Sequence, residues 1–72
     1  MSTIDHAAAL IAEFDPGAAH LYRTQPFRRH ALVTALHRSM ADCYLAPHAD
    51  EIAALLRAAA DAEMARLTGE RA

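Results

Sequence analysis

The stretch that decides the fold is Pro26-Phe27-Arg28-Arg29-His30-Ala31-Leu32-Val33-Thr34-Ala35-Leu36-His37-Arg38-Ser39-Met40-Ala41-Asp42-Cys43-Tyr44-Leu45. At about 100° per residue, it divides into a broad apolar sector and a polar sector, which is typical of an amphipathic helix. The apolar sector contains Leu32, Val33, Leu36, Met40, Cys43 and Tyr44. The opposite sector contains Arg28, Thr34, Arg38 and Asp42.

Two prolines mark the ends of this stretch. Pro26 suits a first helical position, because the N–H that it lacks has no intrahelical partner there. Pro47 disfavours helical geometry at Ala46 and so ends the run. We therefore predict one helix over residues 26–45, about 30 Å long at about 1.5 Å per residue.

Composition and pattern favour helices throughout the chain. Of the 72 residues 19 are alanine, the strongest helix former, and two are glycine. Nowhere do apolar and polar residues alternate for long, as they would in a half-buried strand. The fold class is therefore all-α.

Three further helices flank the central one. Ser2 is a candidate cap for a first helix that stops at Asp15-Pro16-Gly17. Asp15 followed by Pro16 suits the start of a short helix over residues 18–23. A last helix is expected from about residue 50 to Thr68, with Gly69 as its stop. We predict three to four helices, in which two long antiparallel helices form a hairpin and the shorter N-terminal helix packs on it.

The size of the core predicts self-association. The 72 residues form a single small helical domain, and alanine adds little buried area to it. Apolar burial at about 25 cal/mol per Å² then nearly cancels against the cost of ordering the chain. A symmetric homodimer that merges two hairpins into a bundle would supply the missing burial.

Charge is distributed unevenly, although the net charge is only −2. Residues 16–41 contain four arginines and three histidines and no acid, whereas both flanks are acidic. We expect basic and acidic helices to lie side by side and neutralise one another, within the chain or across subunits. A second hypothesis is a DNA-binding transcriptional regulator that uses the basic helix 26–45, with Arg28, Arg29, Thr34 and Arg38 on the nucleic acid. Four arginines would give weak, salt-sensitive binding.

The cellular compartment is predicted from three features that the sequence lacks: a disulfide, a signal peptide and a membrane span. Cys43 is the only cysteine, so no internal disulfide forms. The N-terminus lacks the positive region of a signal peptide, and the longest apolar run, Ala7 to Ala12, is far shorter than the ~20 residues of a membrane span. We expect a cytoplasmic protein that does not enter a membrane.

Histidines and one carboxylate are the candidate ligands. His30, His37 and Tyr44 recur every seven residues along the margin of the apolar sector. The two histidines stand roughly 10 Å apart, so a metal between them would need ligands from another helix or a second subunit. Glu63 falls within the apolar stripe of the last helix. It either pairs with an arginine such as Arg29 or is exposed past the end of the partner helix, or else it is a perturbed acid or base that faces His37 or Tyr44. We favour structural roles for the histidines and for Glu63, and keep His30, His37 and Glu63 as the metal candidates.

These features together favour a protein that acts by association. We expect a small helical protein–protein interaction module, either a homo-oligomer or an accessory or regulatory subunit, that works through an amphipathic helical surface. Its partner is itself or another protein, and the residues of that surface are Arg28, Arg29, His37, Arg38 and Tyr44. The alternative is a metal- or small-ligand-binding helical protein with histidines at a subunit junction. No nucleophile–base pair or phosphate-binding loop is recognisable, so neither an enzyme nor a cofactor is expected.

Overall fold

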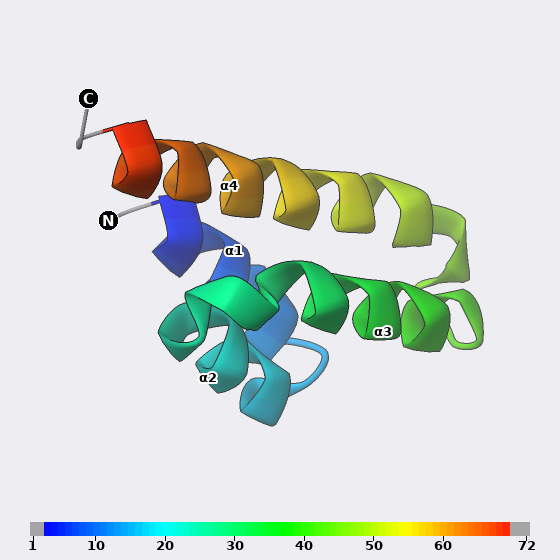
Figure 1. Cartoon of the computed structure of the whole chain (residues 1–72). Helices are drawn as coiled ribbons and strands as arrows, with labels where there is room; N and C mark the ends of the chain where they lie inside the picture. Colours follow the sequence, from blue (N-terminus) through cyan, green and yellow to red (C-terminus); the bar gives the residue numbers. More distant parts are fainter. Residues whose placement is uncertain (1–2, 70–72) are drawn as a thin grey trace.

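The computed structural model describes residues 3–69, and these form helices and turns without a strand (Figure 1). The four α-helices are α1 (Thr3–Ala12), α2 (Pro16–Thr24), α3 (Arg29–Ala41) and α4 (Ala49–Gly69). Two short 3₁₀ helices, η1 (Pro26–Arg28) and η2 (Ala46–His48), lead into α3 and α4. The all-α prediction is confirmed.

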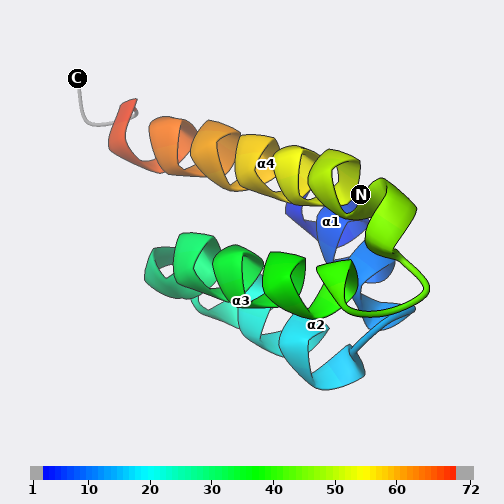
Figure 2. The same ribbon diagram turned by 90° about the vertical axis from the view of Figure 1, so that its right-hand side faces the viewer.

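The long helices α3 and α4 run antiparallel and form the predicted hairpin (Figures 1 and 2). The N-terminal helix α1 packs against α2 and α4, so that the first two helices cover one side of the hairpin. Because α1 and α2 are joined only by residues 13–15, their packing follows from the short connection. The expected placement of the N-terminal helix on the hairpin is confirmed.

In the part of the chain that the structure describes, alanine supplies eight of the fifteen buried apolar residues. The larger buried side chains are Ile4, Ile11, Tyr22, Val33, Leu36, Met40 and Leu56. Small side chains let the helix axes approach closely, but each removes little apolar surface from water. The thin core that the composition predicts is therefore present.

The extent of the central helix was predicted wrongly. Residues 26–28 form a 3₁₀ turn rather than α-helix, and α3 ends at Ala41, not at residue 45. Asp42 and Cys43 donate their backbone N–H groups to carbonyls three residues back, at 3.2 Å each, so the last turn tightens. The chain must reverse within residues 42–48 to return along α3, and a helix that continued to Leu45 would leave no room for that reversal. Cys43 and Tyr44 consequently lie in a turn.

The cap of the short second helix is confirmed. Asp15 adopts extended geometry, and its Oδ1 accepts a hydrogen bond from the Ala18 backbone N–H at 3.2 Å. Pro16 occupies the first turn of α2. Gly69 is the last residue of α4, near the predicted end. The predicted cap Ser2 lies outside the described residues.

Tyr22 and Arg29 form a buried polar cluster where α2 meets α3, which we call the Tyr22–Arg29 cluster. The Tyr22 side chain is fully buried, and its hydroxyl donates to the Leu56 carbonyl in α4 at 2.7 Å. Arg29, only 5% exposed, donates through Nε to the Tyr22 carbonyl at 2.6 Å and through Nη2 to the Arg23 carbonyl at 3.1 Å. These carbonyls belong to the last turn of α2, where helical partners are lacking. The guanidinium also lies 5.5 Å from the centre of the Tyr22 ring. The cluster ties α2 to both helices of the hairpin.

Candidate functional site

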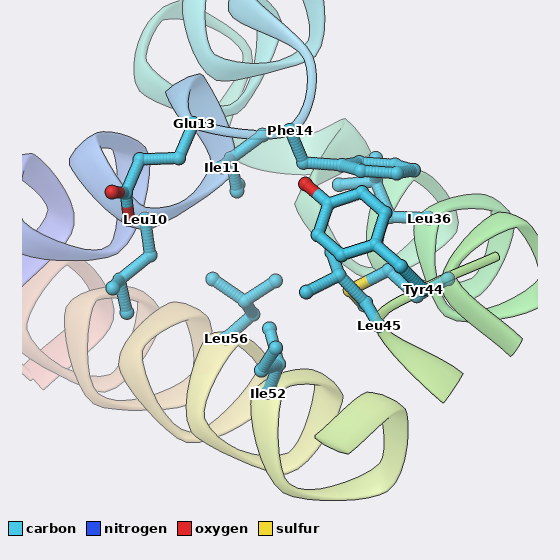
Figure 3. Close-up of a pocket in the computed structure, with 10 residues that line it drawn as sticks. Leu10, Ile11, Glu13, Phe14, Leu36, Tyr44, Leu45, Ile52 and Leu56 are labelled. Atoms are coloured by element: carbon cyan, nitrogen blue, oxygen red, sulfur yellow. The ribbon is translucent and has the colours of Figure 1, made fainter. Parts of the chain in front are cut away.

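An apolar groove opens where the end of α1, the end of α3 and the start of α4 meet (Figure 3). Its volume is about 240 Å³. We call it the Tyr44 groove, and its lining residues are Leu10, Ile11, Glu13, Phe14, Leu36, Met40, Tyr44, Leu45, Ile52 and Leu56. Nine of these ten side chains are apolar or aromatic, so the groove is suited to apolar groups.

The early end of α3 creates this groove. Because the helix stops at Ala41, Tyr44 and Leu45 are carried into the turn, and Tyr44 stays 76% exposed. In Figure 3 the Tyr44 ring lies across one end of the groove, near Phe14, while Ile52 and Leu56 point toward the groove from α4. Leu10 of α1 is also more than two-fifths exposed. Large apolar side chains that share one exposed hollow are typical of a site that binds another apolar surface.

Two polar groups accompany the apolar lining. Glu13 follows α1 and is exposed, and Figure 3 shows its carboxylate beside Leu10. The Tyr44 hydroxyl belongs to the turn after α3. A carboxylate accepts hydrogen bonds and attracts cations, and a phenol both donates and accepts. The groove can therefore hold apolar groups together with a cationic donor near Glu13.

The histidines of α3 face aspartates of α4. Nε2 of His30 lies 2.6 Å from Oδ1 of Asp61, and Nε2 of His37 lies 2.7 Å from Oδ1 of Asp50. On the other pair of helices, Nε of Arg23 in α2 lies 3.4 Å from Oδ1 of Asp5 in α1. Basic residues of α2 and α3 therefore lie beside acidic residues of α1 and α4, as expected, and a histidine pairs as a cation only when it is protonated. Tyr44 lies beyond the end of α3, so it does not continue the row of His30 and His37.

The metal candidates are not brought together. His30 and His37 each contact a different aspartate, and Glu63 lies beside Arg66. Among residues 3–69, no group of three or more His, Cys, Asp or Glu side chains is close enough to hold a metal ion. No described cluster thus supports the metal-binding alternative.

Glu63 finds its partner on its own helix. Its carboxylate lies 2.5 Å from Nη2 and 3.4 Å from Nε of Arg66, one turn further along α4. The hydrogen bond from Arg66 lowers the pKa of Glu63 most, against a smaller opposing effect of desolvation, and the charges of Arg66 and Arg29 lower it further. Of the predicted partners, Arg29 therefore acts on Glu63 through its charge, and the bonded arginine is Arg66.

The predicted interaction residues separate into two groups. Arg28, Arg38 and Tyr44 are exposed and His37 is partly exposed, as a binding surface requires. Arg29 is buried in the Tyr22–Arg29 cluster and does not reach the surface. The sequence predicted Tyr44 but not its neighbours in the groove, since Phe14 and Ile52 belong to other segments of the chain and only packing brings them beside it. The one local signal was Tyr44-Leu45 directly before Ala46-Pro47, where a helix has to end.

In comparisons with known proteins, the chain matches no protein-family model, no curated protein and no solved structure. Within the described residues, no helix combines the length and the apolar character that crossing a bilayer requires. The fold and the groove of this chain together define the class of protein: a small all-α protein with an exposed apolar groove.

Proposed function

We propose that this protein is a helical protein–protein interaction module whose Tyr44 groove receives the apolar face of a partner helix. The observation that carries the proposal is Tyr44 itself, a large aromatic side chain that is 76% exposed at one end of a groove with apolar walls. Tyrosine combines a large apolar ring with a hydroxyl, and for this reason it is enriched at protein interfaces.

The dimensions of the groove favour side chains of a helix as its occupant. A cavity of about 150 Å³ holds one benzene-sized group. The Tyr44 groove, at about 240 Å³, therefore has room for roughly one to two large apolar side chains. An amphipathic helix presents such side chains at i, i+3, i+4 and i+7. The exposed carboxylate of Glu13 favours a partner with an arginine or lysine beside its apolar stripe.

The two alternatives have less support. A metal site would need a second subunit to complete it, because residues 3–69 assemble no set of three ligands. Binding of DNA through residues 26–45 would have to do without Arg29, which is buried, and the remaining arginines of η1 and α3 are Arg28 and Arg38. Fewer phosphate contacts mean weaker binding.

A designed peptide tests the proposal. The probe is a fluorescein-labelled 18-residue amphipathic helix with leucines at i, i+4 and i+7 and one arginine at the border of the stripe, followed by fluorescence anisotropy. We expect micromolar binding that Tyr44→Ala weakens at least tenfold, because the aromatic anchor is lost. Replacing the arginine of the peptide with glutamate should weaken binding several-fold.

Phe27→Ala is the matched control. Phe27 is an aromatic residue that is 88% exposed, and it does not line the Tyr44 groove, so its loss should leave the affinity unchanged. Equal affinities of the wild type and the Tyr44→Ala variant would contradict the proposal, as would the absence of binding at millimolar peptide. Binding of octylamine without binding of the peptide would assign the groove to small ligands instead.

A further inference from the structure

A second groove runs between α2 and α3, and it shares only Phe14 and Leu36 with the lining of the Tyr44 groove. It consists of two adjoining hollows that share Leu21 and Leu32. One hollow extends to Asp15 and Ser39, and the other extends to Arg28. We call the whole the α2–α3 groove. Leu21 is nearly half exposed along its wall, so apolar surface here is in contact with water.

The two ends of this groove carry opposite charges. Asp15 lies at one end, where its Oδ1 caps α2 and its carboxylate remains exposed. Arg28 lies at the other end and is exposed, and its guanidinium has no hydrogen-bond or ion-pair partner within residues 3–69. A groove with an acidic end and a basic end is complementary to its own image rotated by a two-fold axis across its centre.

The face of α3 in this groove suits close approach of a second helix. Ala31, Ala35 and Ser39 lie four residues apart, which places them on one line along the helix. All three are small and exposed, so they permit a short distance between two helix axes. Leu32 borders the same line and can meet Leu21 of a neighbouring molecule.

We propose that the α2–α3 groove is the surface through which two copies of this chain form a two-fold symmetric dimer. The α3 helices of the two copies cross antiparallel near Ala35, and Arg28 of each copy faces Asp15 of the other. The buried apolar contacts supply what the alanine-rich core lacks, because Leu21 and Leu32 leave water. The dimer contacts involve Leu21, Leu32 and Ala35, whereas the peptide-binding proposal depends on Tyr44, so each proposal can fail without the other.

The size of the α2–α3 groove determines how tightly we expect the dimer to associate. The groove offers roughly half of the 20–30 residues that each side contributes to a standard interface. Interfaces at this low end are weak and transient, so we expect a dissociation constant in the micromolar range. Sedimentation velocity from about 1 µM to 1 mM protein would therefore show a monomer that converts to a dimer.

Ala35→Arg is the principal test. A long charged side chain at the crossing point prevents close approach of the two α3 helices, and it should raise the dimer dissociation constant at least tenfold. Ala54→Arg is the matched control, since Ala54 is an exposed alanine of α4 that lines neither groove. A chain that stays monomeric at 1 mM would overturn the proposal, and so would a dimer that Ala35→Arg leaves intact.

The charged ends provide an independent test. Asp15→Asn keeps a good helix cap but removes the charge, and Arg28→Gln removes its counterpart. Each substitution should raise the dimer dissociation constant about twofold to fivefold, as expected for an exposed ion pair. The double variant should raise it by less than the product of the two single increases, because the second substitution removes a pair that is already broken. Arg38→Gln, an exposed arginine of α3 outside the groove lining, is the control and should have no such effect. If the increase in the double variant equals the product of the two single increases, the Arg28–Asp15 pairing is wrong. A Tyr44→Ala variant that dimerises with the wild-type dissociation constant would show that dimerisation does not depend on Tyr44.

Discussion

The two ends of α3 use polar and apolar groups in opposite ways. At its start, the charged side chain of Arg29 is buried and donates to two carbonyls of α2. Just beyond its end, the aromatic ring of Tyr44 is exposed beside an apolar groove. The polar group lies inside and the apolar group outside, the reverse of the usual preference.

This difference shows how to tell a structural residue from a residue available for binding. Within residues 3–69, no buried side-chain nitrogen or oxygen lacks a hydrogen-bond partner, so the Tyr22–Arg29 cluster is complete in one copy of the chain. The apolar walls of the Tyr44 groove and the ring of Tyr44 face water and gain by being covered. The Tyr22–Arg29 cluster is therefore a structural feature, and the end near Tyr44 is where we propose that a partner binds.

The largest expected effect on stability comes from disrupting the Tyr22–Arg29 cluster. Arg29→Met keeps the length of the side chain but leaves the Tyr22 and Arg23 carbonyls without their donors. We expect a loss of about 2–4 kcal/mol in the free energy of unfolding, measured by urea denaturation. A domain this small has on the order of 5 kcal/mol in total, so the variant should be partly unfolded.

Arg38→Met is the control for Arg29→Met. Arg38 is an exposed arginine of the same helix, and its replacement should change the free energy of unfolding by less than about 0.5 kcal/mol. If the two variants lost similar stability, the distinction between a buried and an exposed arginine of α3 would be wrong.

A smaller effect is expected from the two tyrosines, one at each end. Tyr22→Phe removes the hydroxyl that bonds the Leu56 carbonyl and should cost about 0.5–1.5 kcal/mol, whereas Tyr44→Phe should cost nothing measurable. Burial raises the pKa of Tyr22 above its ordinary value of 10.0, partly offset by the charge of Arg29. The folded state therefore binds the phenolic proton more tightly, and this stabilisation is present below pH 10 and is lost as the pH rises above it. Urea denaturation at pH 7 and pH 11 should show a steeper alkaline loss for the wild type than for Tyr22→Phe.

The smallest expected effect on stability concerns Glu63, whose pKa is lowered in part by the charge of Arg29 in the Tyr22–Arg29 cluster. The hydrogen bond from Arg66 lowers the pKa of Glu63 below its ordinary value of 4.5. The ionised carboxylate then favours the folded state above about pH 4.5, and this contribution disappears as the pH falls through the lowered pKa. Glu63→Gln should flatten the acid limb of stability, measured as the urea midpoint at pH 7, 4.5 and 3. Glu13→Gln removes a carboxylate elsewhere and should leave that limb as steep as in the wild type.

The sequence predicted the elements better than their ends. The apolar spacing of residues 26–45 and the Asp15-Pro16-Gly17 turn were enough for the all-α class, the α3–α4 hairpin and the cap of α2. The length of the central helix was wrong because Asp42, Cys43 and Tyr44 have no strong helix-breaking character, and the reversal toward α4 ends the helix there. The same error hid the Tyr44 groove, since its lining depends on Tyr44 and Leu45 leaving the helix.

The sequence by itself determined which segments are helical, where the charges lie and how little apolar volume the core can contain, because these follow from local spacing and composition. Only the tertiary structure decided that Arg29 points inward and that Leu10, Phe14 and Ile52 share a groove with Tyr44. The physical reason is that a periodic pattern fixes the direction of a side chain around its own helix. The surroundings that it meets depend on where the neighbouring helices end and turn.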